Sequence, residues 1–358
     1  MHESLFEPVR LGAIDLANRI VMAPMTRNRA DPGGVPTVIM ADYYSERAEA
    51  GLIVAEGTWP IANGQAYCRQ PGLQTLAHIA GWSRVVDAVH ARGGKIVLQV
   101  MHAGRIGSKY IKPPGVLTVA PSPLRAAGQV YTDRAGMQPY DEPMELDTDA
   151  VRRIVNEHRL VAIRAREAGF DGVELHGTSG YLPMQFMCTG TNLRRDEYGG
   201  SLANRIRFAV ECLSGMAEGM GADRVGLRLN PGNTYNDTSD DDSVQTHVAL
   251  MEKAAELGLA WLHVMRSSDP GIDAFALARR HFGERLILND SIGAAEGARL
   301  IDEGAASAVS FARDFIGNPD LVRRLREGLP LAKFDRKTLY TAGSVGYSDY
   351  PAAPACVA

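Results

Sequence analysis

Short runs of apolar residues, rich in β-branched side chains, recur along the chain and alternate with longer polar and apolar mixtures. Each run is too short for a helix and has the length and composition of a buried strand. The runs lie at residues 20–23, 52–55, 96–100, 173–175, 225–229, 261–264, 286–288 and 308–311. The chain therefore predicts eight buried strands.

The stretches between these runs have apolar residues at helical spacing. Examples are positions 79, 82, 85, 86 and 89, and positions 151, 154, 158, 161 and 165. Such a period predicts amphipathic helices that cover the strands from outside. Strand and helix alternation requires parallel strands, and eight units favour a closed (β/α)8 TIM barrel over the alternative, an open doubly wound sheet. We expect residues 1–358 to form one domain of this kind.

Three segments do not belong to a minimal barrel. Residues 1–18 have short apolar pieces around Gly12, which predict a small hairpin that plugs one end of the barrel. Residues 101–148, rich in proline and glycine, form a long excursion after the third strand, and long structured loops usually cover an active site. The tail from residue 331 carries four aromatic residues, Phe334, Tyr340, Tyr347 and Tyr350.

Composition and charge indicate a protein that acts on a small molecule. The net charge is -4, and no dense run of Lys and Arg suggests a nucleic-acid partner. No apolar run reaches the roughly 18 residues of a membrane helix, and the N-terminus lacks a signal-peptide pattern, so we expect a cytoplasmic location and no membrane partner. The four cysteines are scattered, without the spacing of a disulfide framework or a metal site.

Polar residues end the predicted strands. In a barrel the carboxyl ends of the strands converge on one mouth, so these residues are expected to line a common site. Most of these residues carry amide, hydroxyl or guanidinium groups. Glycoside hydrolysis or a divalent metal site would instead need paired carboxylates, so both are disfavoured. The set suits a planar heterocycle with a phosphate tail, such as flavin mononucleotide (FMN). The residues concerned are Thr26, Glu56, Gln99, His102, His176, Arg228, Asn289 and Arg313.

The fourth predicted strand opens into a loop that is crowded with reactive groups. His176, Thr178, Ser179 and Tyr181 follow one another within six residues, between two glycines that allow tight turns. Catalytic groups often collect on loops that a rigid scaffold holds. We expect this loop to be the reaction centre.

Several segments, in order, resemble the Old Yellow Enzyme family of FMN-dependent ene-reductases. They are LFEPVRLG, NRIVMAPMTRNR, ADYYSERA, GWSRVVDAVHARGGKIVLQVMHAGR, the Asn-x-Arg-x-Asp-Glu-Tyr-Gly-Gly-Ser-x-x-Asn-Arg-x-Arg-Phe run of residues 192–208, VGLRLNP, FIGNPDLVRRLREG and GYSDYP. Downstream of the loop, Ser201 is expected to cap a helix that begins at Leu202, and Arg194, Asp196, Arg205 and Arg207 to brace the loop.

The resemblance implies a cofactor site. Thr26 is expected near the flavin C4 carbonyl, Gly57 beside the ring and Gln99 at the pyrimidine edge. Arg228 is expected by N1, where a cation stabilises the charge of reduced flavin, and Arg313 at the phosphate. The full set is Pro24, Met25, Thr26, Gly57, Gln99, Arg228, Asp290, Ser291, Ala312 and Arg313. Each residue taken alone also has a structural explanation, such as a turn hydroxyl, a core amide or a buried ion pair.

The resemblance also implies the residues that face the substrate. His176 would donate a hydrogen bond to the oxygen of an activated alkene, and Tyr181 would supply the proton. Substrate-binding residues are expected to be His176, Thr178, Ser179, Met101 and Tyr67. The structural alternative is a histidine bonded to backbone and a tyrosine that packs with Phe186.

Four positions depart from the family. Ser179 replaces the usual Asn or His and has a shorter reach. Met101 replaces a common Trp, which is expected to widen the pocket. Asp290 and Ala312 stand where glycine is usual near the phosphate, and the side chain of Asp290 is expected to point away from it. FMN affinity could be reduced.

The sequence thus predicts an FMN-dependent NAD(P)H oxidoreductase that reduces the C=C bond of α,β-unsaturated carbonyl compounds, with nitroalkenes or nitrate esters as further substrates. NADPH or NADH would be the reductant, in ping-pong order, and the protein would be a monomer or a homodimer. The alternative is a flavin-binding barrel with weakened catalysis that serves as a binding protein. A multidomain flavoenzyme similar to dienoyl-CoA reductase is disfavoured, because no iron–sulfur cysteine cluster is present.

Overall fold

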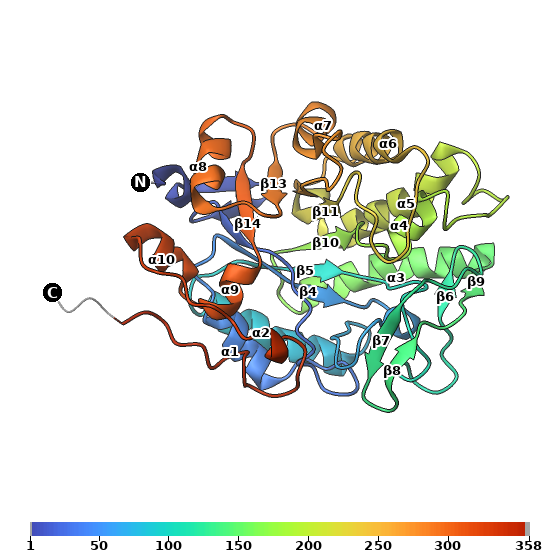
Figure 1. Cartoon of the computed structure of the whole chain (residues 1–358), viewed down its shortest axis with the longest axis horizontal. Helices are drawn as coiled ribbons and strands as arrows, with labels where there is room; N and C mark the ends of the chain where they lie inside the picture. Colours follow the sequence, from blue (N-terminus) through green and yellow to red (C-terminus); the bar gives the residue numbers. More distant parts are fainter. Residues whose placement is uncertain (1, 355–358) are drawn as a thin grey trace.

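The computed structural model describes residues 2–354 and contains a closed barrel of eight parallel strands in the order β10-β11-β12-β13-β14-β3-β4-β5. Closure confirms the predicted TIM barrel and excludes the open sheet (Figure 1). The strands are β3 (Ile20–Met22), β4 (Leu52–Thr58), β5 (Ile96–Val100), β10 (Gly172–His176), β11 (Val225–Leu229), β12 (Trp261–Met265), β13 (Leu286–Asn289) and β14 (Ala308–Phe311). All eight predicted runs are strands, and differ at their ends by at most a few residues.

Helices surround the barrel. They are α1 (Val38–Ser45), α2 (Leu76–His90), α3 (Thr148–Glu167), α4 (Leu182–Met187), α5 (Leu202–Met220), α6 (Ser243–Glu256), α7 (Ala274–His281), α8 (Ala294–Asp302), α9 (Arg313–Gly317) and α10 (Leu321–Glu327). Single 3-10 turns occur at Glu3–Phe6, Ala62–Gly64, Ala222–Arg224 and Arg336–Thr338.

Helix α3 has the predicted helical spacing of apolar residues. Its apolar face buries Val151, Ile154, Val161 and Ala165, together with His158. Helix α5 packs beside it and begins at the expected residue, because the Ser201 hydroxyl accepts a hydrogen bond from the Asn204 backbone N–H at 3.3 Å. Such a cap satisfies one of the free N–H groups of a helix start.

The N-terminal hairpin closes one end of the barrel, as predicted. Strands β1 (Val9–Leu11) and β2 (Ile14–Leu16) are antiparallel. Their buried residues Leu11, Ile14 and Leu16 share a cluster with barrel-interior residues such as Val97 and Trp261. The turn needs glycine, because a Cβ on Gly12 would lie 2.1 Å from the Asp223 carbonyl oxygen.

The excursion forms two small sheets. Strand β6 (Val119–Ala120) pairs with β9 (Met144–Glu145), and β7 (Gln129–Thr132) forms an antiparallel hairpin with β8 (Gly136–Pro139). In Figure 1 the N-terminal segment lies at the left of the molecule and these strands lie at the right. The excursion therefore stands at the end of the barrel opposite the plug.

Buried arginines hold the C-terminal segment, residues 335–350, against the barrel. The Arg29 guanidinium donates to four backbone carbonyls, those of Thr338, Leu339, Gly343 and Val345. The Tyr347 ring stacks on Tyr43, with 4.0 Å between ring centroids. A chain segment with little secondary structure of its own is thereby fixed near the barrel mouth.

No helix within residues 2–354 is long and apolar enough to cross a membrane. Cys68, Cys188 and Cys212 are buried free thiols, as expected of packing residues. Cys356 lies outside the described residues.

Candidate active site

Gln99, His176 and Arg228 lie at the carboxyl ends of three neighbouring strands, β5, β10 and β11. The parallel register places His176 beside Arg228, and Glu174 beside Gln99. Residues separated by two along a strand face the same side, so Glu174 and His176 share one face of β10. The barrel closure thus gathers side chains that are far apart in the sequence.

The loop after β10 is held from both sides. The Gly177 N–H donates to the Arg228 carbonyl at 3.0 Å, and Gly180 has no room for a Cβ, which would lie 2.4 Å from the Tyr235 carbonyl oxygen. Tyr181 follows as the residue that caps α4. The tight turn brings the Tyr181 ring to 5.1 Å from the His176 ring, centroid to centroid.

The His176 imidazole is buried and neutral. Its Nδ1 atom has no hydrogen-bond partner within the described residues. Burial, together with the nearby Arg228 cation, lowers the pKa of His176 from 6.5 to about 3. A buried polar atom without a partner costs about 1–3 kcal/mol, so the ring is available to a group that the chain itself does not supply. The alternative of a histidine bonded to backbone through Nδ1 is not observed.

Tyr181 pairs with Tyr67. The two hydroxyl oxygens lie 2.8 Å apart, and either can be the donor. Burial raises the pKa of Tyr181 well above 10 and that of Tyr67 to about 12, so both phenols keep their protons at neutral pH. Phe186, the suggested packing partner of Tyr181, instead stacks on Phe208 with 4.4 Å between centroids.

Thr178 and Ser179 differ in exposure. Thr178 is fully buried, whereas Ser179 is half-buried and has a left-handed backbone with φ 59°. Their hydroxyl oxygens lie 3.4 Å apart. The Ser179 carbonyl accepts a hydrogen bond from the Asn236 side chain at 2.8 Å, which ties this loop to the loop after β11.

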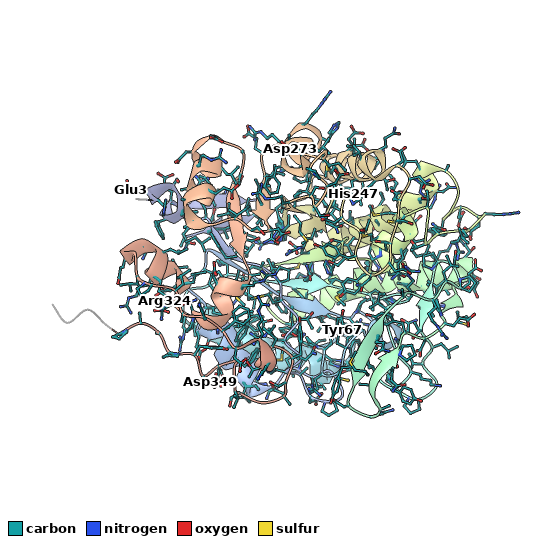
Figure 2. All side chains as sticks on the ribbon, in the orientation of Figure 1. Glu3, Tyr67, His247, Asp273, Arg324 and Asp349 are labelled. Carbon is teal, nitrogen blue, oxygen red and sulfur yellow. The ribbon has the colours of Figure 1, made fainter. Side chains whose placement is uncertain are left out.

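A cavity of about 830 Å³ opens next to this loop. Tyr181, Tyr67 and Thr26 line it, together with β7 of the excursion and part of the C-terminal segment. Figure 2 shows Tyr67 beside the β7–β8 hairpin. The excursion therefore covers the site as expected. The sequence did not identify the further wall residues Asn28, Cys68, Arg69, Gln129, Val130, Tyr131, Asp133, Lys337, Tyr340, Thr341 and Ala342.

Met101 is 2% exposed and, like His176, Thr178 and Ser179, is not among the residues that line the cavity. Its contact with a substrate stays a prediction. Its sulfur packs against Gly57, where a Cβ would lie 2.5 Å from Sδ, and is 3.8 Å from the Gln70 amide nitrogen. Met101 therefore shapes the backbone at Gly57 rather than a wall of the described cavity.

The segment Pro24–Thr26 follows β3 and depends on the buried carboxylate of Glu56, one of the polar strand-end residues that the sequence indicated. Glu56 Oε2 accepts the Arg27 backbone N–H at 3.1 Å, and Glu56 Oε1 accepts the Tyr44 hydroxyl at 3.2 Å. Burial raises the pKa of Glu56, and these donors oppose that shift. The contacts fix the chain just after Thr26 at the mouth.

Arg228 is 6% exposed and contacts polar groups on the next strands. Its guanidinium donates to Asn289 Oδ1 at 2.6 Å and lies 3.5 Å from His263 Nε2. Gln99 donates its amide N–H to Glu174 Oε1 at 2.9 Å. Glu174 and His263 are functional candidates that the sequence reasoning missed. The available signal was a carboxylate inside an otherwise apolar strand, two residues before His176.

The predicted phosphate residues follow two adjacent strands, β13 and β14. Asp290 and Ser291 both have left-handed backbones, φ 82° and 56°, and the Ser291 hydroxyl donates to Asp290 Oδ1 at 3.2 Å. Ala312 precedes α9, and Arg313 is exposed. The orientation of Asp290 relative to a phosphate stays a prediction.

The donor set fits FMN. An amide (Gln99), a buried guanidinium (Arg228) and an exposed one (Arg313) lie on the strand ends around one mouth, and an imidazole nitrogen there has no partner. These groups can hold a ring with carbonyl and N–H edges and a phosphate tail. Within residues 2–354, no cluster of three or more His, Cys, Asp or Glu side chains could hold a metal ion.

Residues 4–332 match the NADH:flavin oxidoreductase / NADH oxidase family. The chain is 39% identical, over 97% of both chains, to a probable flavin mononucleotide-dependent alkene reductase of Leishmania infantum. It is 38% identical to 12-oxophytodienoate reductase 1 of Oryza sativa subsp. japonica, over 97% of this chain and 92% of that protein.

Solved structures of similar proteins have the same fold. Morphinone reductase in complex with tetrahydroNAD superposes with a TM-score of 0.93 at 41% identity, covering 98% of each chain. The Old Yellow Enzyme homologue of Zymomonas mobilis gives a TM-score of 0.94 at 37% identity, covering 98% of this chain and 100% of that one.

Proposed function

Because the chain belongs to the NADH:flavin oxidoreductase / NADH oxidase family, the family of Old Yellow Enzyme, we propose that it uses FMN to reduce the C=C bond of α,β-unsaturated carbonyl compounds. Nitroalkenes and nitrate esters are further candidate substrates. NADH or NADPH would serve as the electron donor, and the complex of morphinone reductase with tetrahydroNAD supports a nicotinamide reductant.

One observation carries the proposal. The neutral His176 imidazole, whose Nδ1 has no partner within the described residues, lies beside Tyr181, which pairs with Tyr67, and both phenols line the cavity. A hydrogen-bond donor and a proton donor thus stand side by side. That is the pair of groups that an electron-poor alkene needs in order to accept a hydride and then a proton.

His176 would hold the carbonyl oxygen of the substrate. Since its pKa is about 3, the ring is neutral at pH 7 and offers a single N–H. This N–H stabilises the negative charge that moves to the oxygen when the alkene is attacked. Thr178 and Ser179 lie next along the loop, and the half-exposed Ser179 hydroxyl would assist the same oxygen.

Bound FMN supplies the hydride, which originates from the nicotinamide and is delivered to the β-carbon of the alkene. Tyr181 would then give its hydroxyl proton to the α-carbon. The raised pKa of Tyr181 ensures that the proton is present at neutral pH. Tyr67, at 2.8 Å, can stabilise the phenolate by donating to it, and because Tyr67 lines the cavity it connects Tyr181 to solvent for reprotonation.

Around the cofactor, Gln99 and Arg228 would bind the pyrimidine edge, Gly57 and the segment Pro24–Thr26 the ring, and Arg313 with the turns at Asp290, Ser291 and Ala312 the phosphate. The support for these assignments is their common position at the carboxyl ends of the strands.

The absorbance spectrum of the purified protein tests the proposal. We expect a yellow protein that bleaches anaerobically with NADPH or NADH and regains its colour when 2-cyclohexenone is added. A protein that stays colourless with added FMN would contradict the proposal. A yellow protein that no nicotinamide bleaches would instead favour a binding role.

A further inference from the structure

Glu174 lies at the centre of a buried polar network below the barrel mouth. Its side chain is fully buried and accepts hydrogen bonds from three donors. Gln99 Nε2 donates to Oε1 at 2.9 Å, while Trp261 Nε1 and His263 Nδ1 donate to Oε2 at 3.0 and 2.9 Å. Every close partner of the carboxylate is thus an N–H donor from another strand.

The carboxylate is ionised. Burial alone would raise the pKa of Glu174, but the hydrogen bonds from His263 and Trp261 and the nearby Arg228 cation hold that pKa below its usual value. A charge buried at this depth is costly unless it is well paired. Apolar residues would fill the same barrel layer without that cost, so the carboxylate calls for an explanation other than stability.

Glu174 also fixes the state of His263. A carboxylate only accepts, so His263 Nδ1 must carry the proton that points at it. Burial and the nearby Arg228 cation lower the pKa of His263, which leaves the ring neutral and Nε2 as an acceptor. Nε2 lies 2.8 Å from the Ser310 hydroxyl and 3.5 Å from Arg228 Nη1, so both can donate to it.

Two hydrogen-bonded links therefore lead from Glu174 to the mouth. In the first, Glu174 orients His263 so that Nε2 can accept from Arg228, which also donates to Asn289 at 2.6 Å. In the second, Glu174 directly takes one N–H of Gln99, which turns the amide carbonyl of Gln99 away from Glu174. A correctly oriented amide can accept from a ring N–H with its oxygen and donate with its remaining N–H.

We infer that Glu174, with His263, is a positioning and charge-balancing unit that sets the reduction potential of the bound flavin through Gln99 and Arg228. The inference rests on the proposed placement of Gln99 and Arg228 against the pyrimidine edge. The negative charge of Glu174 partly offsets the Arg228 cation, and so limits how strongly the site favours the anionic reduced flavin over the oxidised one.

Glu174→Gln tests this inference, because it keeps the shape and removes the charge. The amide has one acceptor oxygen for three donors, so the Gln99 amide would turn over and Arg228 would lose its balancing charge. We expect reduced FMN to gain affinity relative to oxidised FMN by roughly tenfold or more. For a two-electron couple this is a positive shift of roughly 30 mV per tenfold, measured anaerobically against a reference dye.

The ratio of the affinities for reduced and oxidised FMN distinguishes a role of Glu174 in setting the potential from a merely structural role. A structural defect weakens both redox states alike and leaves the potential unchanged. An unchanged or lower potential in a folded, FMN-binding Glu174→Gln protein would overturn the inference while leaving the proposed function intact. Failure of the wild-type protein to take up FMN would instead overturn the proposed function.

Asp320→Asn is the matched control. Asp320 is another buried carboxylate and pairs at 2.7 Å with Arg324 of α10, which Figure 2 shows at the left of the molecule, away from Tyr67. This variant should lose stability without a change in flavin potential. A shift equal to that of Glu174→Gln would contradict the inference, since it would show that any lost buried charge alters the potential.

His263→Asn provides a second test of the inference if Glu174→Gln does not fold. The asparagine amide can still donate to Glu174 but offers no acceptor at the Nε2 position, so only the link from Glu174 to Arg228 is lost. With the carboxylate charge retained and the cation loosened, the potential should shift in the negative direction. An unchanged potential in this variant would overturn the role of His263.

Discussion

Ser179 adopts a left-handed backbone conformation, φ 59°, that asparagine tolerates better than serine. Ser179→Asn should therefore fold with a stability within about 0.5 kcal/mol of wild type. Because the amide reaches further than the hydroxyl, the KM for enones should fall. Steady-state kinetics with 2-cyclohexenone and a nitroalkene measure this, and unchanged constants for both would show that the serine does not contact the substrate.

His176 gives the activity a characteristic pH dependence. With a pKa of about 3, the ring stays neutral from pH 5 upward, so kcat/KM for the enone should show no ionisation near pH 6.5. A stopped-flow pH series on the reduced enzyme tests this. An acid limb between pH 6 and 7 that disappears in His176→Asn would contradict the assignment of a neutral imidazole.

At the scale of elements, apolar periodicity was sufficient to predict the eight strands and the N-terminal hairpin, and the capping residue Ser201 was sufficient to predict the start of α5. These features follow from local sequence, or from the need to bury one face. The Glu174 and His263 contact was not predictable in this way, because it joins strands 89 residues apart and depends on the barrel register. The contact of Met101 with Gly57 was not predictable for a similar reason, since it depends on packing between β4 and the end of β5.

The C-terminal segment had few local signals beyond its aromatic residues, yet it lines the cavity with Lys337 and Tyr340. Its attachment depends on Arg29, and no periodic pattern in the surrounding sequence indicates that this arginine is buried. The loop of reactive groups around His176, by contrast, was visible in sequence because four functional positions fall within six residues.

Arg29→Met should release this segment. The substitution removes the donors of four backbone carbonyls, and should cost about 2–4 kcal/mol of unfolding free energy. Hydrogen exchange of residues 336–347 should accelerate, and the KM for enones should rise while FMN affinity changes little. Arg326→Met, on α10 at the left of Figure 1, is the control. Equal exchange in wild type and Arg29→Met would refute the role of Arg29.

At the scale of the whole molecule, buried histidines should make stability fall with acid. Their folded pKa lies below the unfolded value of 6.5, so the stabilisation is complete above pH 6.5 and is lost as the pH falls below it. A residue whose folded pKa is about 4 or lower, such as His158 or His176, should lose roughly 1 kcal/mol between pH 6.5 and 5.5. The buried residues with a lowered pKa are His78, His102, His158, His176, His247 and His263.

Denaturant unfolding at saturating FMN, at pH 7.5 and at pH 5.5, measures this loss. His158, whose pKa is about 4, lies on the buried face of α3. His158→Gln should therefore reduce the difference between the two pH values by roughly 1 kcal/mol. A stability that does not change between pH 7.5 and 5.5 would be inconsistent with neutral buried imidazoles.

The two half-reactions of Tyr181→Phe test the central claim most directly. Rapid mixing follows flavin absorbance as a nicotinamide reduces the protein, and again as 2-cyclohexenone reoxidises it. Removal of the phenol proton should leave the first rate within about twofold and slow the second by roughly 10²–10⁴-fold. Tyr110→Phe, outside the cavity, should alter neither rate. Equal losses in both half-reactions, or no loss in the second, would contradict Tyr181 as the proton donor.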